Sequence, residues 1–150
     1  MKHDHQGVTL LYANSPVRPD QLKLAESLFS TVGEVAVLED EGLFNAATAI
    51  SGCGPAYFYH LADSLTQAAG DVGLSEKIAE KLAPQTFIGA SALLVNTCES
   101  ASTLKNQVAR PGSVTEAALK VLENSSEVLS QLMSKAVHKA VERSRELSQN

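Results

Sequence analysis

The sequence predicts an all-α fold, a multi-helix bundle with a short extended segment at its N-terminus. Apolar residues recur at helical spacing through most of the 150 residues, and Ala, Leu, Glu, Lys and Gln dominate these periodic stretches. The points that break the helical pattern are short, so the helices follow one another without a long linker. A chain of this length buries roughly two thirds of its unfolded surface, and we therefore expect one compact bundle with its own core.

The N-terminal part departs from the helical pattern. Val8 to Tyr12 is a short β-prone run, and because one strand cannot satisfy its own backbone, its partners are expected elsewhere in a larger protein. Pro19 fits the first position of a helix that continues to the left-handed stop supplied by Gly33. The β-branched stretch 34–38 is a strand or an extended link.

Three helices are expected in the middle of the chain. The stretch 51–55 separates a helix over 40–50 from one over 55–73, because its two glycines permit unusual backbone angles and its proline suits a first helical turn. The third helix covers 75–96 and contains Pro84, which removes one intrahelical hydrogen bond. We expect a kink at that proline.

The C-terminal third carries the clearest helical periodicity. A short helix over 103–108 leads to a turn at 110–113, and a new helix over 114–122 opens directly behind this turn. The last helix is expected from Glu127 to about Ser148. It carries a two-residue apolar stripe that repeats once per turn: Val128, Leu129, Leu132, Met133, Ala136, Val137, Ala140 and Val141. Such a stripe indicates a core or a subunit interface.

Charge and hydropathy exclude two classes of partner. A net charge of -5 and the lack of a basic stripe argue against nucleic acid. The start of the chain has no apolar signal region, and no apolar run approaches the roughly 20 residues that span a bilayer. We expect a soluble cytoplasmic protein without a membrane partner.

No metal site is expected. Cys53 and Cys98 lie far apart and outside any ligand spacing, so they are interpreted as ordinary thiols in a reducing compartment. His3, Asp4 and His5 lie in a terminus that offers poor coordination geometry.

The turn before the helix over 114–122 is the strongest candidate site. It places Gly112, Ser113, Val114 and Thr115 where a helix has unpaired N–H groups and partial positive charge, an arrangement that attracts carboxylates. An ordinary N-cap is the alternative interpretation. The other glycine-rich element, 52–54, follows a helix and so lacks the strand-turn-helix context of a dinucleotide site.

The order of these motifs resembles that of the pyrroline-5-carboxylate reductase family. The resemblance rests first on Leu28-Phe29-Ser30-Thr31-Val32-Gly33 followed by Ala49-Ile50-Ser51-Gly52-Cys53-Gly54-Pro55-Ala56-Tyr57. It continues through Ala68-Ala69, Gly73-Leu74, Gln85-Thr86, Gly89-Ala90, Leu104-Lys105, Pro111-Gly112, Thr115, Val121-Leu122-Glu123 and Arg143-Ser144-Arg145-Glu146-Leu147. It covers nearly everything from Gly7 onward.

The resemblance implies an organisation and an activity. The family reduces 1-pyrroline-5-carboxylate to L-proline with NADPH or NADH, which binds a Rossmann domain that precedes the helical region. The helical region makes an intertwined dimer. On this basis, 1–16 is the remnant of a link to an absent Rossmann domain, and 17–150 is the dimerisation and substrate-binding domain. No cofactor is expected to bind this chain alone.

The resemblance also assigns roles to the candidate residues. Pro111, Gly112, Ser113 and Val114 would hold the substrate carboxylate, and Thr115 would be the catalytic hydroxyl that reaches the ring nitrogen or the carboxylate. Gly52, Cys53 and Gly54 would form the pocket wall beside the nicotinamide. Arg110 and Ser113 depart from the family pattern, which carries a small hydroxyl residue and a glycine at these places.

Three functional hypotheses follow from the sequence. The first is a reductase dimerisation domain that is inactive alone. The second is a structural oligomerisation module that binds itself or a full-length reductase and whose substrate pocket has decayed, as Arg110 and Ser113 suggest. The third is an enzyme completed by a separate Rossmann polypeptide. The partners expected are a second copy, a cofactor domain and a small-molecule substrate.

Overall fold

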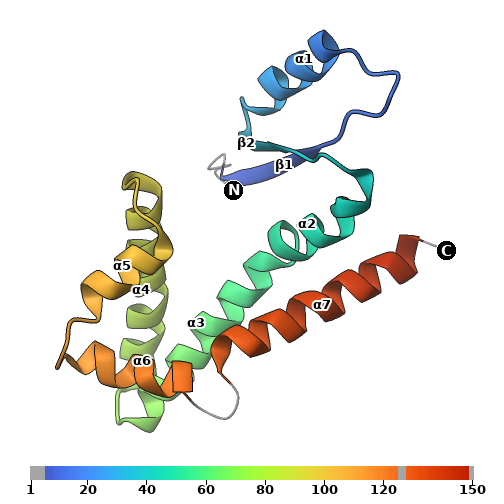
Figure 1. The fold of residues 1–150 in the computed structure, drawn as a ribbon. Helices are drawn as coiled ribbons and strands as arrows, with labels where there is room; N and C mark the ends of the chain where they lie inside the picture. The colour runs from blue at the N-terminus through green and yellow to red at the C-terminus, as the bar shows by residue number, and fades with distance from the viewer. Residues whose placement is uncertain (1–5, 125–127, 149–150) are drawn as a thin grey trace. The chain divides into compact units, whose positions relative to one another are not determined.

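The computed structural model describes residues 6–124 and 128–148. The chain divides into two compact units, Met1–Gly54 with Ala136–Asn150, and Pro55–Lys135, and each is described by itself. Helices dominate both units (Figure 1), which confirms the predicted fold class. Among the described residues, no helix is both long enough and apolar enough to cross a membrane.

The first unit opens with a β-α-β arrangement. Strand β1 (Gly7–Leu11) pairs in parallel with β2 (Gly33–Val37), and helix α1 (Pro19–Phe29) connects them. The register runs from Gly7 opposite Gly33 to Leu11 opposite Val37. The expectation that β1 has no partner in this chain was therefore wrong, because the helix between the strands returns the chain in the same direction.

Gly33 is required for a reason other than the expected one. A Cβ at this position would lie 2.3 Å from the carbonyl oxygen of Gly7 on the facing strand, which no side chain tolerates. The glycines with positive φ in the described residues are Gly73 and Gly112, so Gly33 is not the left-handed stop that its place after a helix suggested. It allows β1 and β2 to approach each other.

Two further helices complete the first unit. A single 3-10 turn, η1 (Glu41–Leu43), leads into α2 (Phe44–Ser51), and the chain returns to this unit in the C-terminal part of α7 (Leu129–Ser148). The side chains of Asn45 and Ser144 join α2 to α7 at 2.6 Å. The predicted start of the last helix at Glu127 lies outside the described residues.

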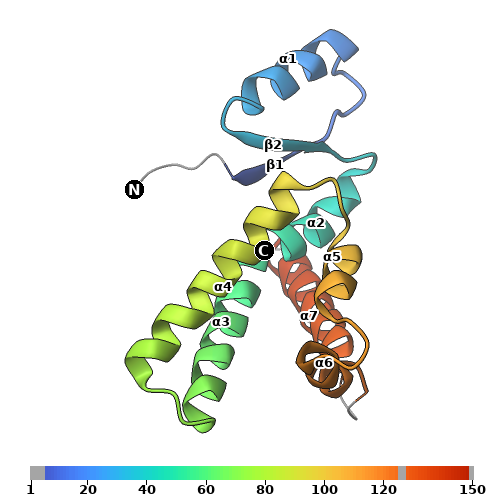
Figure 2. The same cartoon turned by 90° about the vertical axis from the view of Figure 1, so that its left-hand side faces the viewer.

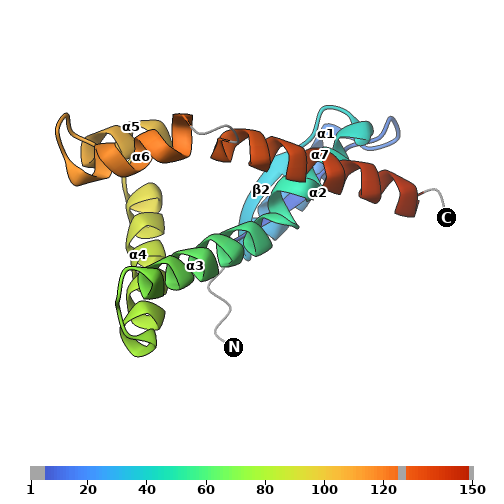
Figure 3. The same cartoon turned by 90° about the horizontal axis from the view of Figure 1, so that it is seen from below.

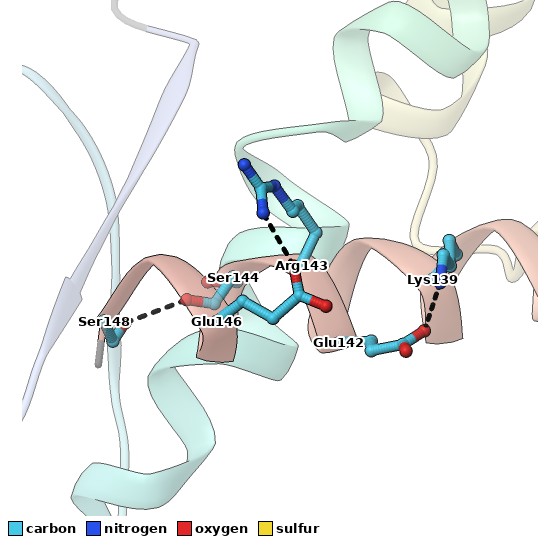
Figure 4. A network of polar contacts seen from close by, with 6 residues as sticks. All are labelled: Lys139, Glu142, Arg143, Ser144, Glu146 and Ser148. Carbon is cyan, nitrogen blue, oxygen red and sulfur yellow. Dashed lines mark hydrogen bonds and ion pairs between the residues drawn. The ribbon is translucent and has the colours of Figure 1, made fainter. Parts of the chain in front are cut away.

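Local ion pairs lie along α7 (Figure 4). Lys139 pairs with Glu142 at 2.7 Å, and Arg143 pairs with Glu146 at the same distance. Both pairs join residues three apart on exposed helix, where water screens the attraction and such contacts add little to stability. Glu142 and Glu146 line a hollow together with Val137 and Val141, so these charged residues border the apolar stripe.

The second unit is built from helices alone. Helix α3 (Gly54–Asp71) turns at Gly73, whose φ of 93° is left-handed, into α4 (Glu76–Asn96), and the two form a helical hairpin (Figure 2). The predicted break after α2 is confirmed, whereas α2 begins at Phe44 and α5 at Ala101 rather than at the expected residues 40 and 103. Helix α4 continues through Pro84. Helices α5 (Ala101–Val108) and α6 (Val114–Asn124) follow, joined by the turn that carries the candidate residues (Figure 3).

The expected compact core is not found. The buried apolar residues among those described are Ala49, Ala79 and Ala83. Large apolar side chains stay exposed along the helices, including Leu24, Leu28, Ile50, Phe58, Tyr59, Leu65, Val72, Ile78, Leu82, Ile88, Leu93, Leu94, Val95, Val121 and Leu132. Since exposed apolar surface on this scale marks an interaction face, the helical stripes indicate surfaces that another molecule covers.

Candidate functional site

The turn between α5 and α6 is closed by local hydrogen bonds. The N–H of Ser113 donates to the carbonyl of Arg110 at 2.9 Å, and Gly112 has a left-handed φ of 76°. Glycine adopts this backbone conformation without the steric cost that a Cβ brings. The ring of Pro111 fixes its own φ. The sequence Arg-Pro-Gly-Ser therefore delivers the chain to the start of α6 at Val114.

Ser113 and Glu116 cap the new helix reciprocally. The Ser113 hydroxyl accepts the N–H of Glu116 at 3.1 Å, and the Glu116 carboxylate accepts the N–H of Gly112 at 2.8 Å. This is close to a capping box, although the carboxylate reaches one residue beyond the N-cap. The N-cap interpretation of Ser113 is therefore correct, and it explains a serine at this place.

The capping leaves two of the predicted donors available. Gly112 and Ser113 donate their N–H groups within the chain, whereas the N–H groups of Val114 and Thr115 have no hydrogen-bond partner among the described residues. The side chain of Val114 is exposed and that of Thr115 is partly buried. The two adjacent N–H groups and the Thr115 side chain thus belong to the first turn of α6, where the helix dipole favours a negative charge.

The charges next to this helix end are arranged in pairs. Glu116 lies 3.2 Å from Lys120 on the next turn of α6, and Lys105 of α5 lies 2.6 Å from Glu123. The hydrogen bond from Gly112, followed by the contact with Lys120, lowers the pKa of the Glu116 carboxyl below its ordinary value of 4.5. A polar hollow of about 290 Å³ lies between α5 and α6 beside these pairs.

The second group of candidate residues forms the break between α2 and α3. The N–H groups of Gly52 and Cys53 both donate to the carbonyl of Thr48, at 2.8 and 3.1 Å. A Cβ on Gly52 would lie 3.0 Å from that carbonyl oxygen, so the tight turn favours glycine. Gly54 is buried and begins α3. The backbone donors of this turn are therefore used by the helix end that precedes it.

The candidate residues fall in different units. Gly52, Cys53 and Gly54 close the first unit, and the turn from Pro111 to Thr115 belongs to the second. Their assignment to one pocket stays a prediction. His3, Asp4 and His5 lie outside the described residues, and those that are described contain no group of three or more His, Cys, Asp or Glu side chains placed to hold a metal ion.

Glu116 is the residue of this site that the sequence reasoning missed. Its signal was present, because Ser113 and Glu116 have the Ser-x-x-Glu spacing of a capping box directly before an apolar run. The same spacing explains how one carboxylate reaches back over the turn to Gly112.

The fold and the site together define a class of protein, a helical association domain that follows a β-α-β unit and has, at the start of α6, two N–H groups without partners in the described part of the chain. Residues 41–147 match the family model described as "Pyrroline-5-carboxylate reductase dimerisation". The chain belongs to the pyrroline-5-carboxylate reductase family and contains its dimerisation domain.

Individual relatives support this assignment over nearly the whole chain. The pyrroline-5-carboxylate reductase of Pseudomonas aeruginosa is 37% identical over 144 residues, which cover 96% of this chain and 52% of that protein. The reductase of Synechocystis is 39% identical over 141 residues, covering 94% and 52%. This chain thus spans about half the length of the curated relatives it matches.

Solved structures of the family share the fold. The pyrroline-5-carboxylate reductase of Coxiella burnetii matches with a TM-score of 0.87 and 40% identity, over 95% of this chain and 52% of that one. The pyrroline carboxylate reductase of Plasmodium falciparum, whose structure has NADP bound, matches with a TM-score of 0.76 and 30% identity, over 95% and 56%.

Proposed function

We propose that this chain is the dimerisation and substrate-binding half of a reductase that converts 1-pyrroline-5-carboxylate to L-proline with NADPH or NADH. The observation that carries the proposal is the family match over residues 41–147. The match covers about half the length of the relatives, which supports the proposal that activity also requires a Rossmann domain joined to this region. Without that domain the chain is inactive.

The site at the start of α6 supplies the substrate-binding chemistry. The free N–H groups of Val114 and Thr115 suit a carboxylate, which gains charge-assisted hydrogen bonds at a helix N-terminus. The Thr115 hydroxyl both donates and accepts, so it serves either the carboxylate or the ring nitrogen. The chain's contribution to hydride transfer is then to hold the C=N bond in a fixed orientation.

The cofactor belongs to the other domain. The turn at Gly52 and Cys53 does not suit a dinucleotide phosphate, because both N–H groups already donate to Thr48 and the turn follows a helix. When bound, the nicotinamide cofactor supplies the hydride. We propose only a wall beside the nicotinamide for Gly52, Cys53 and Gly54.

Calorimetric titration of L-proline into the purified chain tests the substrate site. Binding is expected, with a loss in Thr115→Ala, because that variant removes the hydroxyl and leaves the helix N-terminus in place. The matched control is Thr103→Ala, since Thr103 lies in the first turn of α5, where its hydroxyl contacts the Ser100 hydroxyl, and no ligand contact is assigned to it. Reduction of pyrroline-5-carboxylate by the chain alone with an added nicotinamide cofactor would refute the requirement for a second domain.

We also propose that a second copy of this chain covers the apolar groove between α3 and α4. This groove has a volume of about 330 Å³ and is lined by Leu65, Ala68, Ala69, Val72, Leu74, Leu82, Ala83 and Thr86. Burial of such side chains contributes about 25 cal/mol per Å² of apolar surface. Sedimentation velocity is expected to show a dimer that Leu82→Asp dissociates and Gln85→Asp, outside the groove lining, leaves intact.

The second candidate function is an oligomerisation module without substrate binding. The observation in its favour is that Gly112 and Ser113, two of the predicted carboxylate donors, already have partners within the chain. A chain that dimerises and binds no L-proline, even when fused to a family cofactor domain, fits this alternative. Turnover on mixing with a separate Rossmann polypeptide would instead indicate an enzyme completed in trans.

A further inference from the structure

The Glu116 carboxylate accepts the hydrogen bond of the Gly112 N–H, one of the backbone donors proposed for a ligand carboxylate. Its Oε2 atom lies 2.8 Å from the Gly112 nitrogen, and its other oxygen lies 3.2 Å from the Lys120 ammonium. Roughly two thirds of the Lys120 side chain and one third of the Glu116 side chain are exposed. Glu116 and Lys120 therefore both reach the surface, where the Glu116 side chain exchanges contacts at little cost.

We propose that Glu116 is an internal competitor that weakens the binding of a ligand carboxylate at the start of α6. The inference rests on the proposed substrate site and concerns one residue that sets its affinity. In the state described by the structure, Glu116 occupies the N–H of Gly112, so a ligand reaches only Val114 and Thr115. A ligand that uses Gly112 as well displaces the Glu116 carboxylate.

Lys120 holds the Glu116 carboxylate after a ligand displaces it from Gly112. It is the only cation within ion-pair distance of Glu116 among the described residues, and it lies one turn further from the helix N-terminus. By neutralising Glu116 there, it reduces the repulsion between that carboxylate and an incoming one. The pair Glu116 and Lys120 thus adjusts the affinity of the turn for anions without contributing a ligand contact of its own.

The test uses the full chain and L-proline as the probe, with calorimetric titration of Glu116→Gln and Glu116→Ala. Both variants remove the competing negative charge, and each is expected to bind L-proline roughly threefold more tightly than the wild type, the scale of an exposed ion pair. The control is Glu123→Gln, which alters a carboxylate of the same helix that pairs with Lys105 and does not reach Gly112. Its affinity is expected to be unchanged.

Lys120→Met provides a second, independent variant, because it keeps Glu116 and removes its cationic partner. The proposal predicts weaker L-proline binding in this variant. It also predicts that the Gly112 amide proton shift titrates with Glu116 in the wild type and loses this titration in Glu116→Gln.

The outcomes separate the two proposals. Tighter binding by the Glu116 variants supports the competitor role. Unchanged or weaker binding by Glu116→Gln, with wild-type binding present, overturns it and leaves the substrate site standing, since Glu116 is then only a helix cap. An absence of L-proline binding in every protein overturns the competitor and the substrate site together.

Discussion

Ser144 on α7 donates its hydroxyl hydrogen to the Oδ1 atom of Asn45 on α2 at 2.6 Å, across 99 positions of sequence. Both residues are partly buried, so neither has full access to water as a replacement partner. This hydrogen bond connects the end of the chain to the helix that precedes the glycine break within the first unit.

Removing this contact is expected to destabilise the first unit. Ser144→Ala leaves the Asn45 oxygen without its donor, which costs about 1 kcal/mol for a partly buried acceptor. The matched control is Ser148→Ala, because the Ser148 hydroxyl donates only within its own helix, to the carbonyl of Ser144. Urea denaturation should show a lower midpoint for Ser144→Ala alone, and equal midpoints for both variants would contradict the prediction.

The β1–β2 approach predicts an asymmetry between two paired glycines. A Cβ at Gly33 meets the Gly7 carbonyl oxygen at 2.3 Å, whereas a Cβ at Gly7 meets nothing within 4 Å. Gly33→Ala is expected to cost about 1–3 kcal/mol, as overpacking does, and Gly7→Ala is expected to be tolerated. Amide hydrogen exchange along β1 measures the difference. Equal protection in the two variants would show that the strands separate without cost.

The left-handed backbone of Gly112 predicts a penalty for any side chain there. Gly112→Ala is expected to lose about 1 kcal/mol or more, although the structure leaves open space around a Cβ at this position. Gly70→Ala is the control, because Gly70 lies in α3, also with open space, and alanine favours helix there. Thermal unfolding should move in opposite directions for the two variants.

The capping of α6 by Glu116 predicts that the stability of the fold depends on pH. The pKa of Glu116 is lowered in the folded chain, first by the Gly112 N–H and then by Lys120, so the ionised form is favoured by folding. Its stabilising contribution is present above the ordinary value of 4.5 and is lost as the pH falls through the lower folded pKa. Stability measured between pH 6 and pH 3 should fall less in Glu116→Gln. An identical decline in both proteins would assign it to other carboxyls.

The helices could be predicted from the sequence because their signals are local. Pro19 begins α1, the stretch 51–55 separates α2 from α3, and Val114 begins α6, as expected from proline, glycine and cap positions. The family resemblance, carried by the motifs around these breaks, is confirmed by the match over residues 41–147. The division at residues 16 and 17 stays a prediction.

The errors concern interactions between distant residues. The pairing of β1 with β2 depends on how α1 returns the chain, which the hydrophobic pattern of Val8 to Tyr12 does not contain. The same pattern cannot distinguish a stripe that packs inside a chain from one that packs against another, so a core was expected where Ala49, Ala79 and Ala83 are the buried apolar residues described. The roles of Thr115 and of the 52–54 turn stay predictions, because they depend on a bound substrate and a second domain.

The parallel pair β1 and β2 leaves each strand with one unpaired edge among the described residues. Such edges recruit other strands without regard to their source. The isolated chain can therefore aggregate in a second way, by pairing of strand edges into β-rich aggregates. This route is separate from association through its apolar helices. A lysine introduced on the outer edge of β1 would suppress that aggregation while leaving the helical surfaces free to associate.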